Sequence, residues 1–581
     1  MSLADTAKSL ETLTKIPAFL LAGSTKDRVV YISNEDGPYS LWSLDCKSGS
    51  KLKMTSEPVE QAATPRHECN EVFYTKDTAK GAEFHKIYKN DTIQRKETLA
   101  VDVQSMRIEG LATAQDMIAF TGATKEEMAL YTAKSGSLEK RTKLEALAAL
   151  TDANPNYLVG YGWLENNPRS NELFIFDLST GQMQEYTPKL GSVNKMPVLN
   201  GSRILFESDF TGKNRLHVYD LERHEVHDAP CAFSDHLAYD ATEHPYFDWM
   251  DDGKVLFVGK RDGEAKVFID GRQVPTSAGY IWGATLLNGK LYVTHTTVIQ
   301  PHRILEIDPQ TSQTRVVVDN QLPPGIREKF KQRQSRLVRY QSFDGRNVPA
   351  LVVDGTGSPR RTITYIHGGP WSEVLNSWER FVASFILMGY NIIAPNYRGS
   401  TGYGEDYRNL DIGDPGGDDL KDIALAAQWA KENGLATENA IVGYSYGGYA
   451  TLLALGKEPE VWSCGVAGAP VADWKESHQM SDAEYRSFIE ILFDHKTELF
   501  EDRSPITYVK NVKKPMCIIS SQNDSRTPMR PVLRYAMNLL DQGVKFELHS
   551  VPEMGHLWRT SEEILSVVYP TIAFLQRQFP A

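Results

Sequence analysis

The chain contains few cysteines for its length. Among 581 residues there are five, widely scattered: Cys46, Cys69, Cys231, Cys464 and Cys517. Because their number is odd and no two form a Cys-x-x-Cys pair, the sequence predicts neither a disulfide framework nor a zinc site, and it favours a reducing compartment. We therefore expect an activity that needs no metal and no organic cofactor.

Long hydrophobic runs are missing as well. No uninterrupted apolar stretch reaches the roughly 18 residues that a membrane-spanning helix needs. The first residues lack the basic n-region of a signal peptide, and the nearest apolar run, 18–22, is short and follows Pro17. Together with the cysteine pattern, these absences predict a cytoplasmic protein that does not associate with membranes.

An excess of positive charge is the third absence. Lysine and arginine number 63 against 75 acidic residues, which gives a net charge of −12. A surface that follows a phosphate backbone is not indicated, so nucleic acid is not an expected partner. Hydrophobic content of 41% and charged content of 24% are those of a folded protein. Because one hydrophobic core stops growing near roughly 250 to 300 residues, we expect two domains.

The N-terminal half repeats one pattern: a short β-branched or aromatic run, a polar turn, and a second run that ends in aspartate or lysine. The first runs begin at Val29, Val72, Met117, Tyr157, Ile204, Val255 and Leu291. Their spacing of roughly 35 to 50 residues is the period of four-stranded propeller blades. The pattern predicts a β-propeller of about seven blades over residues 25–325; an array of β-sandwiches with coincidental spacing is the alternative.

The C-terminal half has a different sequence pattern. After about residue 335, buried-strand runs such as 362–366 and 391–394 alternate with helical segments such as 417–433, as in a mostly parallel sheet. We expect the catalytic domain to span residues 326–581. Residues 1–24, with leucines at 3, 10 and 13, predict a short helical extension outside the propeller.

The strongest local motif is Gly443-Tyr-Ser445-Tyr-Gly447, which lies between a predicted strand and the apolar helical run 450–455. In an α/β-hydrolase fold, Gly-x-Ser-x-Gly forms a sharp strand-to-helix turn that exposes the serine Oγ above the sheet. The motif predicts an α/β-hydrolase domain with Ser445 as the nucleophile.

An acid and a base should follow the nucleophile in this fold, in that order. Asp524 lies in a loop after the predicted strand 516–520, and His556 lies in a loop after the strand 545–551. We predict the catalytic triad Ser445, Asp524 and His556, in which the histidine takes the serine proton and the aspartate fixes the histidine tautomer. The alternative is a helix-capping aspartate and a solvated loop histidine.

A glycine-rich loop closes an early strand of the same half. His367-Gly-Gly-Pro370 stands where such hydrolases bind the oxyanion. We assign the backbone N–H groups of Gly369 and of Tyr446, the residue after the nucleophile, to the oxyanion hole. A simple tight turn is the alternative for this tetrapeptide.

Four motifs of the C-terminal half, taken with the propeller before it, resemble those of the prolyl oligopeptidase family of serine peptidases. They are His367-Gly-Gly-Pro370, Asn396-Tyr-Arg-Gly-Ser-Thr-Gly-Tyr-Gly404, Gly443-Tyr-Ser-Tyr-Gly-Gly-Tyr449 and Asn523-Asp-Ser-Arg-Thr-Pro528. The motifs are most similar to those of the acylaminoacyl-peptidase branch. The resemblance implies a serine exopeptidase that removes an N-acylated amino acid from short peptides, with the propeller excluding folded proteins.

The resemblance also implies substrate-binding residues. Arg526 matches an arginine that helps position the peptide, and its planar guanidinium would bind a carbonyl or carboxylate; a surface ion pair is the alternative. The insertion 474–493 stands where relatives have the pocket beside the attacked carbonyl. Trp474, Tyr485 and Phe488 would line an apolar pocket there, unless they are ordinary packing residues.

Other functions compete with this interpretation. A carboxylesterase acting on small acyl esters would use the same triad, as would an oligopeptidase or a dipeptidyl-peptidase. The dipeptidyl branch binds a free amino terminus with paired glutamates, and no convincing Glu-Glu pair is found in the predicted propeller. An interaction protein with an inactive hydrolase domain is disfavoured by the complete triad. A homo-oligomer through either domain stays open.

Overall fold

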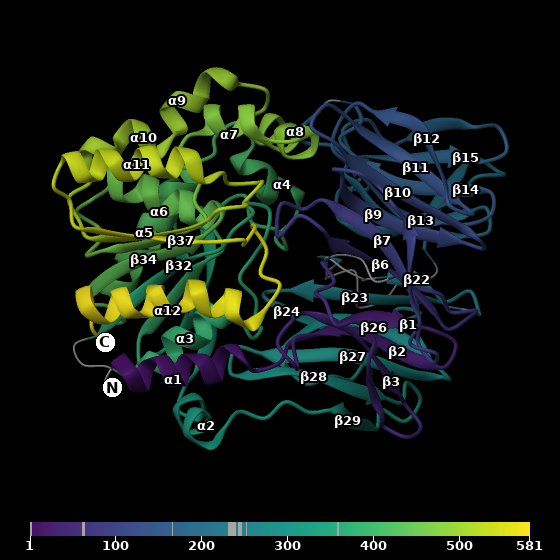
Figure 1. Ribbon diagram of the computed structural model, residues 1–581, viewed down its shortest axis with the longest axis horizontal. Coiled ribbons are helices and arrows are strands. Elements are labelled where there is room, and N and C mark those ends of the chain that lie inside the picture. The colour runs from purple at the N-terminus through teal and green to yellow at the C-terminus, as the bar shows by residue number, and fades with distance from the viewer. Residues whose placement is uncertain are drawn as a thin grey trace.

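The structure is a computed structural model, in which two domains lie side by side (Figure 1). It describes residues 3–60, 64–165, 167–229, 240–241, 247–250, 252–356 and 360–581. Of the predicted features, Cys231 lies outside the described residues. No helix in the described part of the chain is long and apolar enough to cross a membrane.

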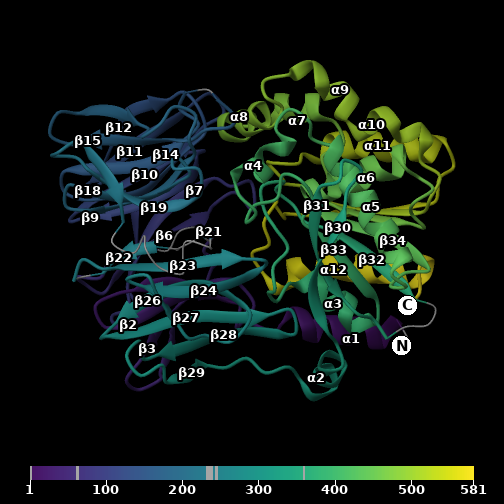
Figure 2. The ribbon, with the colours of Figure 1, turned by 180° about the vertical axis from the view of Figure 1, so that it is seen from behind.

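The first domain is a ring of antiparallel sheets, each formed by one continuous stretch of chain, and the described residues form seven of them. Figure 2 shows them from behind. The first four blades are β1–β4 (Phe19–Ser24, Arg28–Ser33, Ser40–Asp45, Lys51–Lys53), β5–β8 (Thr64–Pro65, Glu71–Asp77, His85–Asp91, Glu97–Val101), β9–β12 (Arg107–Ala114, Met117–Ala123, Met128–Lys134, Ser137–Leu144) and β13–β16 (Ala148–Ala153, Tyr157–Gly162, Glu172–Asp177, Gln182–Tyr186). The last three are β17–β20 (Asn194–Asn200, Arg203–Ser208, Arg215–Asp220, Glu225–Asp228), β21–β25 (Asp240–Ala241, Phe247–Trp249, Val255–Arg261, Glu264–Ile269, Arg272–Val274) and β26–β29 (Tyr280–Leu287, Lys290–Thr297, Gln300–Ile307, Thr314–Val318).

The ring closes by packing of the first blade against the last. Phe19 and Leu21 of β1 share a core cluster with Leu287 of β26. Ser24 Oγ also lies 3.0 Å from Thr285 Oγ1 and donates to the Leu286 carbonyl at 3.0 Å. These contacts bury the apolar faces of both blades, so the two ends of the repeat stabilise one another. The seven-bladed propeller is confirmed.

The second domain is built on one eight-stranded sheet in the order β30-β31-β33-β32-β34-β35-β36-β37. Its strands are Ser335–Gln341, Asn347–Val353, Arg361–Ile366, Asn391–Pro395, Glu438–Tyr444, Gly465–Gly468, Met516–Ser521 and Phe546–Val551, for β30 to β37 in chain order. The first two strands pair antiparallel with their neighbours, and the others run parallel. The parallel strands are apolar along most of their length because helices cover both faces. The α/β-hydrolase domain is confirmed.

Helices pack on both sides of this sheet (Figure 1). The described helices outside the insertion are α1 (Leu3–Thr14), α2 (Pro324–Lys331), α3 (Arg380–Met388), α4 (Glu405–Arg408), η2 (Asn409–Asp411), α5 (Asp418–Glu432), α6 (Tyr446–Lys457), α11 (Met529–Asp541) and α12 (Ser561–Gln578). Those between β35 and β36 are α7 (Trp474–Met480), α8 (Ala483–Leu492), η3 (Thr497–Leu499), α9 (Phe500–Arg503), α10 (Pro505–Tyr508) and η4 (Val509–Asn511). The helix α1 precedes the propeller in sequence, but it packs against α3 and α12 of the second domain.

One predicted boundary is wrong. The propeller does not begin at residue 25, because β1 starts at Phe19 and pairs with β2 along its length. The N-terminal helix ends at Thr14, so the extension is shorter than residues 1–24. At the other end, the expected boundary at residues 325 and 326 falls inside α2, which connects β29 to β30.

Candidate active site

Ser445 occupies a sharp turn between β34 and α6. Its backbone has φ 58° and ψ −121°, in a region that residues with a side chain rarely adopt. The turn is tight, since a Cβ on Gly443 would clash with the backbone of Gly447, and one on Gly447 would clash with the Ile366 carbonyl. The glycines of the motif are therefore required by close backbone approach, and the turn lifts the serine to the end of the sheet.

The structure brings the three predicted triad residues into one hydrogen-bonded chain. His556 Nε2 lies 2.9 Å from Ser445 Oγ, and His556 Nδ1 lies 2.8 Å from Asp524 Oδ2. Asp524 is held in turn, because its Oδ1 accepts the backbone N–H of Arg526 at 2.9 Å and of Thr527 at 2.8 Å. The aspartate side chain has no exposed surface. This arrangement can transfer the serine proton to the histidine while the aspartate holds the imidazole tautomer.

The predicted oxyanion loop runs beside the nucleophile. A Cβ on Gly368 would lie 3.2 Å from Ser445 Cβ and 3.8 Å from its Oγ, and Gly369 has φ 117°. Tyr446 is the first residue of α6, where backbone N–H groups have no partner within the helix. Both predicted amides thus come from segments next to Ser445, and their role stays a prediction.

His367 fixes the shape of this loop. It donates from Nδ1 to the Gly368 carbonyl at 2.7 Å, lies 2.9 Å from Ser400 Oγ through Nε2, and stacks on Tyr397 with 4.4 Å between ring centroids. Burial lowers the pKa of His367 to about 4, so the ring is neutral at physiological pH. His367 therefore acts as a positioning residue of the loop.

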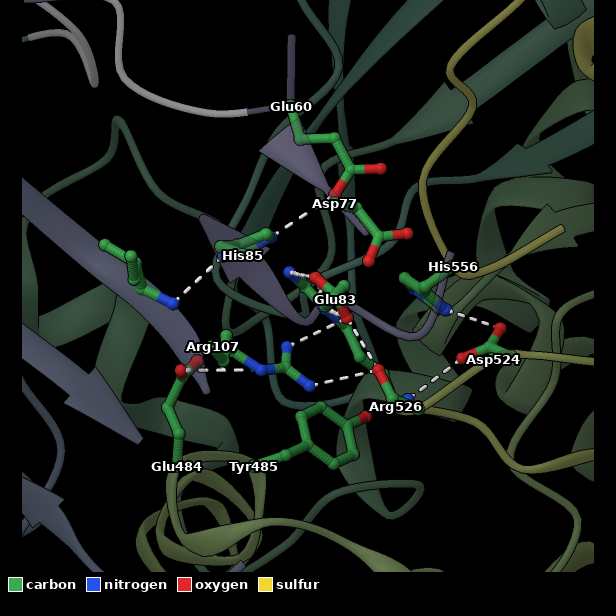
Figure 3. Close-up of polar contacts among 12 residues, drawn as sticks. Glu60, Asp77, Glu83, His85, Arg107, Glu484, Tyr485, Asp524, Arg526 and His556 are labelled. Atoms are coloured by element: carbon green, nitrogen blue, oxygen red, sulfur yellow. Dashed lines mark hydrogen bonds and ion pairs between the residues drawn. The ribbon is translucent and has the colours of Figure 1, made fainter. Parts of the chain in front are cut away.

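Arg526 lies at the boundary between the two domains (Figure 3). Its Nε is 3.1 Å from both carboxylate oxygens of Glu83, a propeller residue that is 2% exposed. Glu83 also accepts from Ser525 Oγ at 2.7 Å and pairs with Arg107 at 3.0 Å. The alternative of an ion pair is therefore realised, although the pair is buried between domains and not on the surface. The role of Arg526 in substrate binding stays a prediction.

A propeller loop between β6 and β7 contacts both catalytic loops of the second domain. On the acid loop, Asn523 Nδ2 donates to the Lys80 carbonyl at 2.9 Å. On the base loop, Lys80 pairs with Glu553, and Gly81 lies backbone to backbone against Gly555, the residue before His556. We name residues 78–84 the propeller clasp. Through it, the first domain contributes to the placement of Asp524 and His556.

The predicted pocket residues have different surroundings. Trp474 is 1% exposed and packs edge-on against Tyr449 and Phe493 in the core. The prediction of Trp474 as a pocket residue is wrong, because its indole is part of the buried core cluster that contains both of these residues. Tyr485 and Phe488 on α8 are half-buried and stack with 5.3 Å between ring centroids.

Two tryptophans that the sequence did not indicate as site residues extend the pair Tyr485 and Phe488 into an aromatic wall. Trp371 directly follows the oxyanion loop and packs edge-on against Phe488 at 5.3 Å. Trp163 of the propeller stacks on Trp371 at 5.6 Å, and the Arg408 guanidinium lies 4.3 Å from the Trp371 ring. The position of Trp371 immediately after Pro370 was a usable signal, whereas nothing in the sequence indicated Trp163.

The close approach within the clasp leads to a prediction. The substitution Gly81→Ala places a Cβ against the Gly555 backbone and must displace the base loop. A displacement of about 1 Å at a catalytic group costs roughly a hundredfold in rate, so we expect kcat/KM to fall by that factor. Gly136→Ala is the matched control, since Gly136 also has a positive φ, 82°, but no atom within 4 Å of its Cβ position. Equal kinetic losses in both variants would contradict a role of the clasp.

The buried pair gives a pH-dependent prediction. Burial by itself would raise the pKa of Glu83, but the charges of Arg526 and Arg107 outweigh it and hold the pKa below the ordinary range. The stabilisation of the folded protein by the Glu83 ion pairs is therefore complete above the unfolded glutamate pKa of about 4.3. It is lost as pH falls below that value. Removing one partner of a buried pair costs about 3 to 5 kcal/mol. Glu83→Gln should lower Tm strongly at pH 7 and less near pH 3.

An exposed pair between the same two domains supplies the control. Lys80 and Glu553 are 65% and 66% exposed, and such pairs contribute roughly 0 to 1 kcal/mol. Thermal unfolding should therefore change little in Glu553→Gln. A Tm loss in Glu83→Gln that is as small as this one, or that is equal at both pH values, would show that the buried pair does not stabilise the interface.

Comparisons with known proteins agree with this architecture. Residues 30–305 match the family model "Acylamino-acid-releasing enzyme-like, N-terminal domain", and residues 377–581 match "Prolyl oligopeptidase family". The chain is similar in fold to a puromycin-hydrolyzing peptidase of Mycobacterium tuberculosis, with a TM-score of 0.82 and 16% identity over 98% of this chain and 96% of that one.

Two curated relatives match the chain in part. The acylamino-acid-releasing enzyme of Mus musculus is 29% identical over 247 residues, which is 40% of this chain and 33% of that protein. The dipeptidyl aminopeptidase BIII of Pseudoxanthomonas mexicana is 30% identical over 230 residues, 38% of this chain and 33% of that protein. The chain thus covers about a third of the length of these relatives. The hydrolase domain thus matches the prolyl oligopeptidase family of serine peptidases, and the propeller matches the N-terminal domain of acylamino-acid-releasing-enzyme-like proteins.

Proposed function

We propose that the protein is a serine exopeptidase that removes N-acylated amino acids from the N-terminus of short peptides. The observation that carries this proposal is the hydrogen-bonded chain from Ser445 through His556 to Asp524. His556 takes the Ser445 proton as Oγ attacks the carbonyl, and then returns it to the leaving amine. The acyl-enzyme ester on Ser445 is hydrolysed by water in the reverse sequence of proton transfers.

The position of the triad at the domain boundary supports a preference for short peptides. The propeller clasp touches both catalytic loops, and Trp163 of the propeller extends the aromatic wall that Trp371 begins. A half-buried serine at a domain boundary favours a flexible peptide of a few residues over a folded protein. Half-buried Tyr485 and Phe488 favour an apolar side chain next to the attacked carbonyl.

The acidic groups around the triad support an acylated substrate. A free amino terminus needs a carboxylate partner when it is taken out of water. Glu83, which Figure 3 draws near the triad together with the propeller carboxylates Glu60 and Asp77, is engaged by Arg526, Arg107 and Ser525. Burial and the charge of Glu109 raise the pKa of Glu484 well above its ordinary range, and Arg107 lies 3.7 Å from its carboxylate. A neutral N-acyl group fits these surroundings better than an ammonium.

Removal of dipeptides from unblocked peptides is the second candidate, because one of the curated relatives is a dipeptidyl aminopeptidase. It would require Glu83 or Glu484 to exchange its present partners for the substrate amine. Ester hydrolysis is the third candidate, since the same triad cleaves an activated ester without protonating a poor leaving group.

Chromogenic substrates separate these candidates. We expect acetyl-leucine p-nitroanilide to be cleaved at least tenfold faster, in kcat/KM, than leucine p-nitroanilide or glycyl-phenylalanine p-nitroanilide. A preference for the unblocked dipeptide anilide would replace the proposal with the dipeptidyl activity. Turnover of a p-nitrophenyl ester alone would support the assigned triad but exclude peptidase activity.

A further inference from the structure

Three side chains of different chemistry converge on one face of the sheet, away from the triad. Cys517 lies on β36, and Glu547 and His549 lie on β37. Cys517 is the direct cross-strand partner of Glu547, and His549 follows Glu547 at an interval of two residues. Because side chains alternate along a strand, all three point to the same face. Their ligand atoms all lie within 4.8 Å of one another.

The ligand set selects a class of cation. A thiolate, an imidazole and a carboxylate suit Zn²⁺, which is bound at about 2.0 to 2.3 Å by these groups in a tetrahedral arrangement. Three protein ligands leave the fourth position for water or another small ligand. Mg²⁺ and Ca²⁺ prefer oxygen ligands only, so they are disfavoured by the sulfur and the nitrogen.

The three ligands differ in burial. Cys517 is fully buried, whereas the side chains of Glu547 and His549 are 29% and 39% exposed. A cation would therefore sit above the thiol with an open side toward solvent. Cys517 and Glu547 as anions neutralise a divalent cation, and the thiol proton is released to water when the sulfur binds.

The charged neighbour of the group is Arg577 on α12. Its Nη2 lies 2.7 Å from both carboxylate oxygens of Glu547, and its side chain is 42% exposed. A carboxylate offers about four lone-pair positions, so Glu547 can keep this contact and still bind a cation. Arg577 then orients the ligand, as groups around metal sites commonly do.

We propose that Cys517, Glu547 and His549 form a binding site for Zn²⁺ that joins β36 to β37. The two strands lead directly into the acid and base loops, since Asp524 follows β36 and His556 follows β37. A bound cation would cross-link the N-terminal parts of the two strands, whereas the catalytic loops follow their C-terminal ends. Cysteine spacing along the chain cannot reveal such a site, because its ligands come from two strands that meet only in the folded sheet.

Cobalt spectroscopy on the tag-free, full-length protein tests the site. Co²⁺ is the probe, because a bound thiolate gives a ligand-to-metal charge-transfer band that surface carboxylates cannot produce. We expect this band with one Co²⁺ per chain and its loss when Zn²⁺ is added. Cys517→Val, which removes the thiol, should abolish the band, and His549→Gln should weaken Co²⁺ binding at least tenfold.

Two matched variants control for indirect effects of the substitutions on Co²⁺ binding. Cys464→Val removes another fully buried thiol, and His227→Gln removes an exposed histidine of the propeller, so both should bind Co²⁺ as the unmodified protein does. Because His549 is partly exposed, its variant is expected to fold even if the Cys517 variant does not. A missing band in the unmodified protein, or an equal loss in Cys464→Val, would overturn the proposal.

Discussion

Replacing Ser445 with alanine is expected to lower kcat by about a millionfold, because removing a triad nucleophile leaves only the oxyanion hole and substrate binding. Ser445 Oγ is the atom that His556 Nε2 contacts at 2.9 Å, and no other group can take its place in the turn. The rate is measured with acetyl-leucine p-nitroanilide under single-turnover and steady-state conditions. KM should change little, since the substrate contacts are kept.

Ser520→Ala is the control for this variant. Ser520 is a buried serine of β36, and its Oγ has no hydrogen-bond partner among the described residues, so its loss should be nearly neutral. Residual activity of Ser445→Ala above roughly one-thousandth of the unmodified rate would mean that another residue is the nucleophile.

Replacing Asp524 with asparagine should lower kcat by about ten-thousandfold. Asp524 Oδ2 accepts from His556 Nδ1 at 2.8 Å and from Thr527 Oγ1 at 2.8 Å, while Oδ1 accepts two backbone N–H groups. In asparagine, an NH₂ group replaces one of these two oxygens and faces hydrogen-bond donors at either position. If it faces His556 Nδ1, the histidine restores the hydrogen bond only in the wrong tautomer. The pH dependence of kcat and the rate at pH 7 are measured together.

The control for this variant is Asp541→Asn at the exposed end of α11, which should keep full activity. A loss of less than about tenfold in Asp524→Asn would show that the aspartate does not orient the histidine. Loss of Tm by the same variant would point instead to a folding defect, because Asp524 holds its own loop through backbone hydrogen bonds.

Much of the propeller was predictable because the middle strands of the blades are apolar on both faces. The seven predicted runs fall in β2, β6, β10, β14, β18, β23 and β27, the strands that carry nearly continuous burial. Half of the residues of β1 are only partly buried, so this strand gave no comparable signal. This is why β1 was assigned to the N-terminal extension, and why the boundary was placed at residue 25 and not at Phe19.

The triad was predictable because each member lies in a local motif at the end of a strand. Arg526 was found in the same way, but its partner Glu83 was not, since the two are separated by 443 residues in sequence. The contact of Gly81 with Gly555 depends on how the domains dock, which no local pattern reports. Trp474 was assigned wrongly because an aromatic residue in a helical insertion has the same sequence pattern whether it lines a pocket or the core.

Product analysis of two tripeptides tests the central claim most directly. Acetyl-Leu-Ala-Ala and unblocked Leu-Ala-Ala are incubated separately with the protein, and the products are identified by mass spectrometry. We expect acetyl-leucine and Ala-Ala from the blocked peptide, and at least tenfold slower cleavage of the unblocked one. Release of Leu-Ala from the unblocked peptide, with the blocked peptide left intact, would contradict the proposed N-acyl exopeptidase.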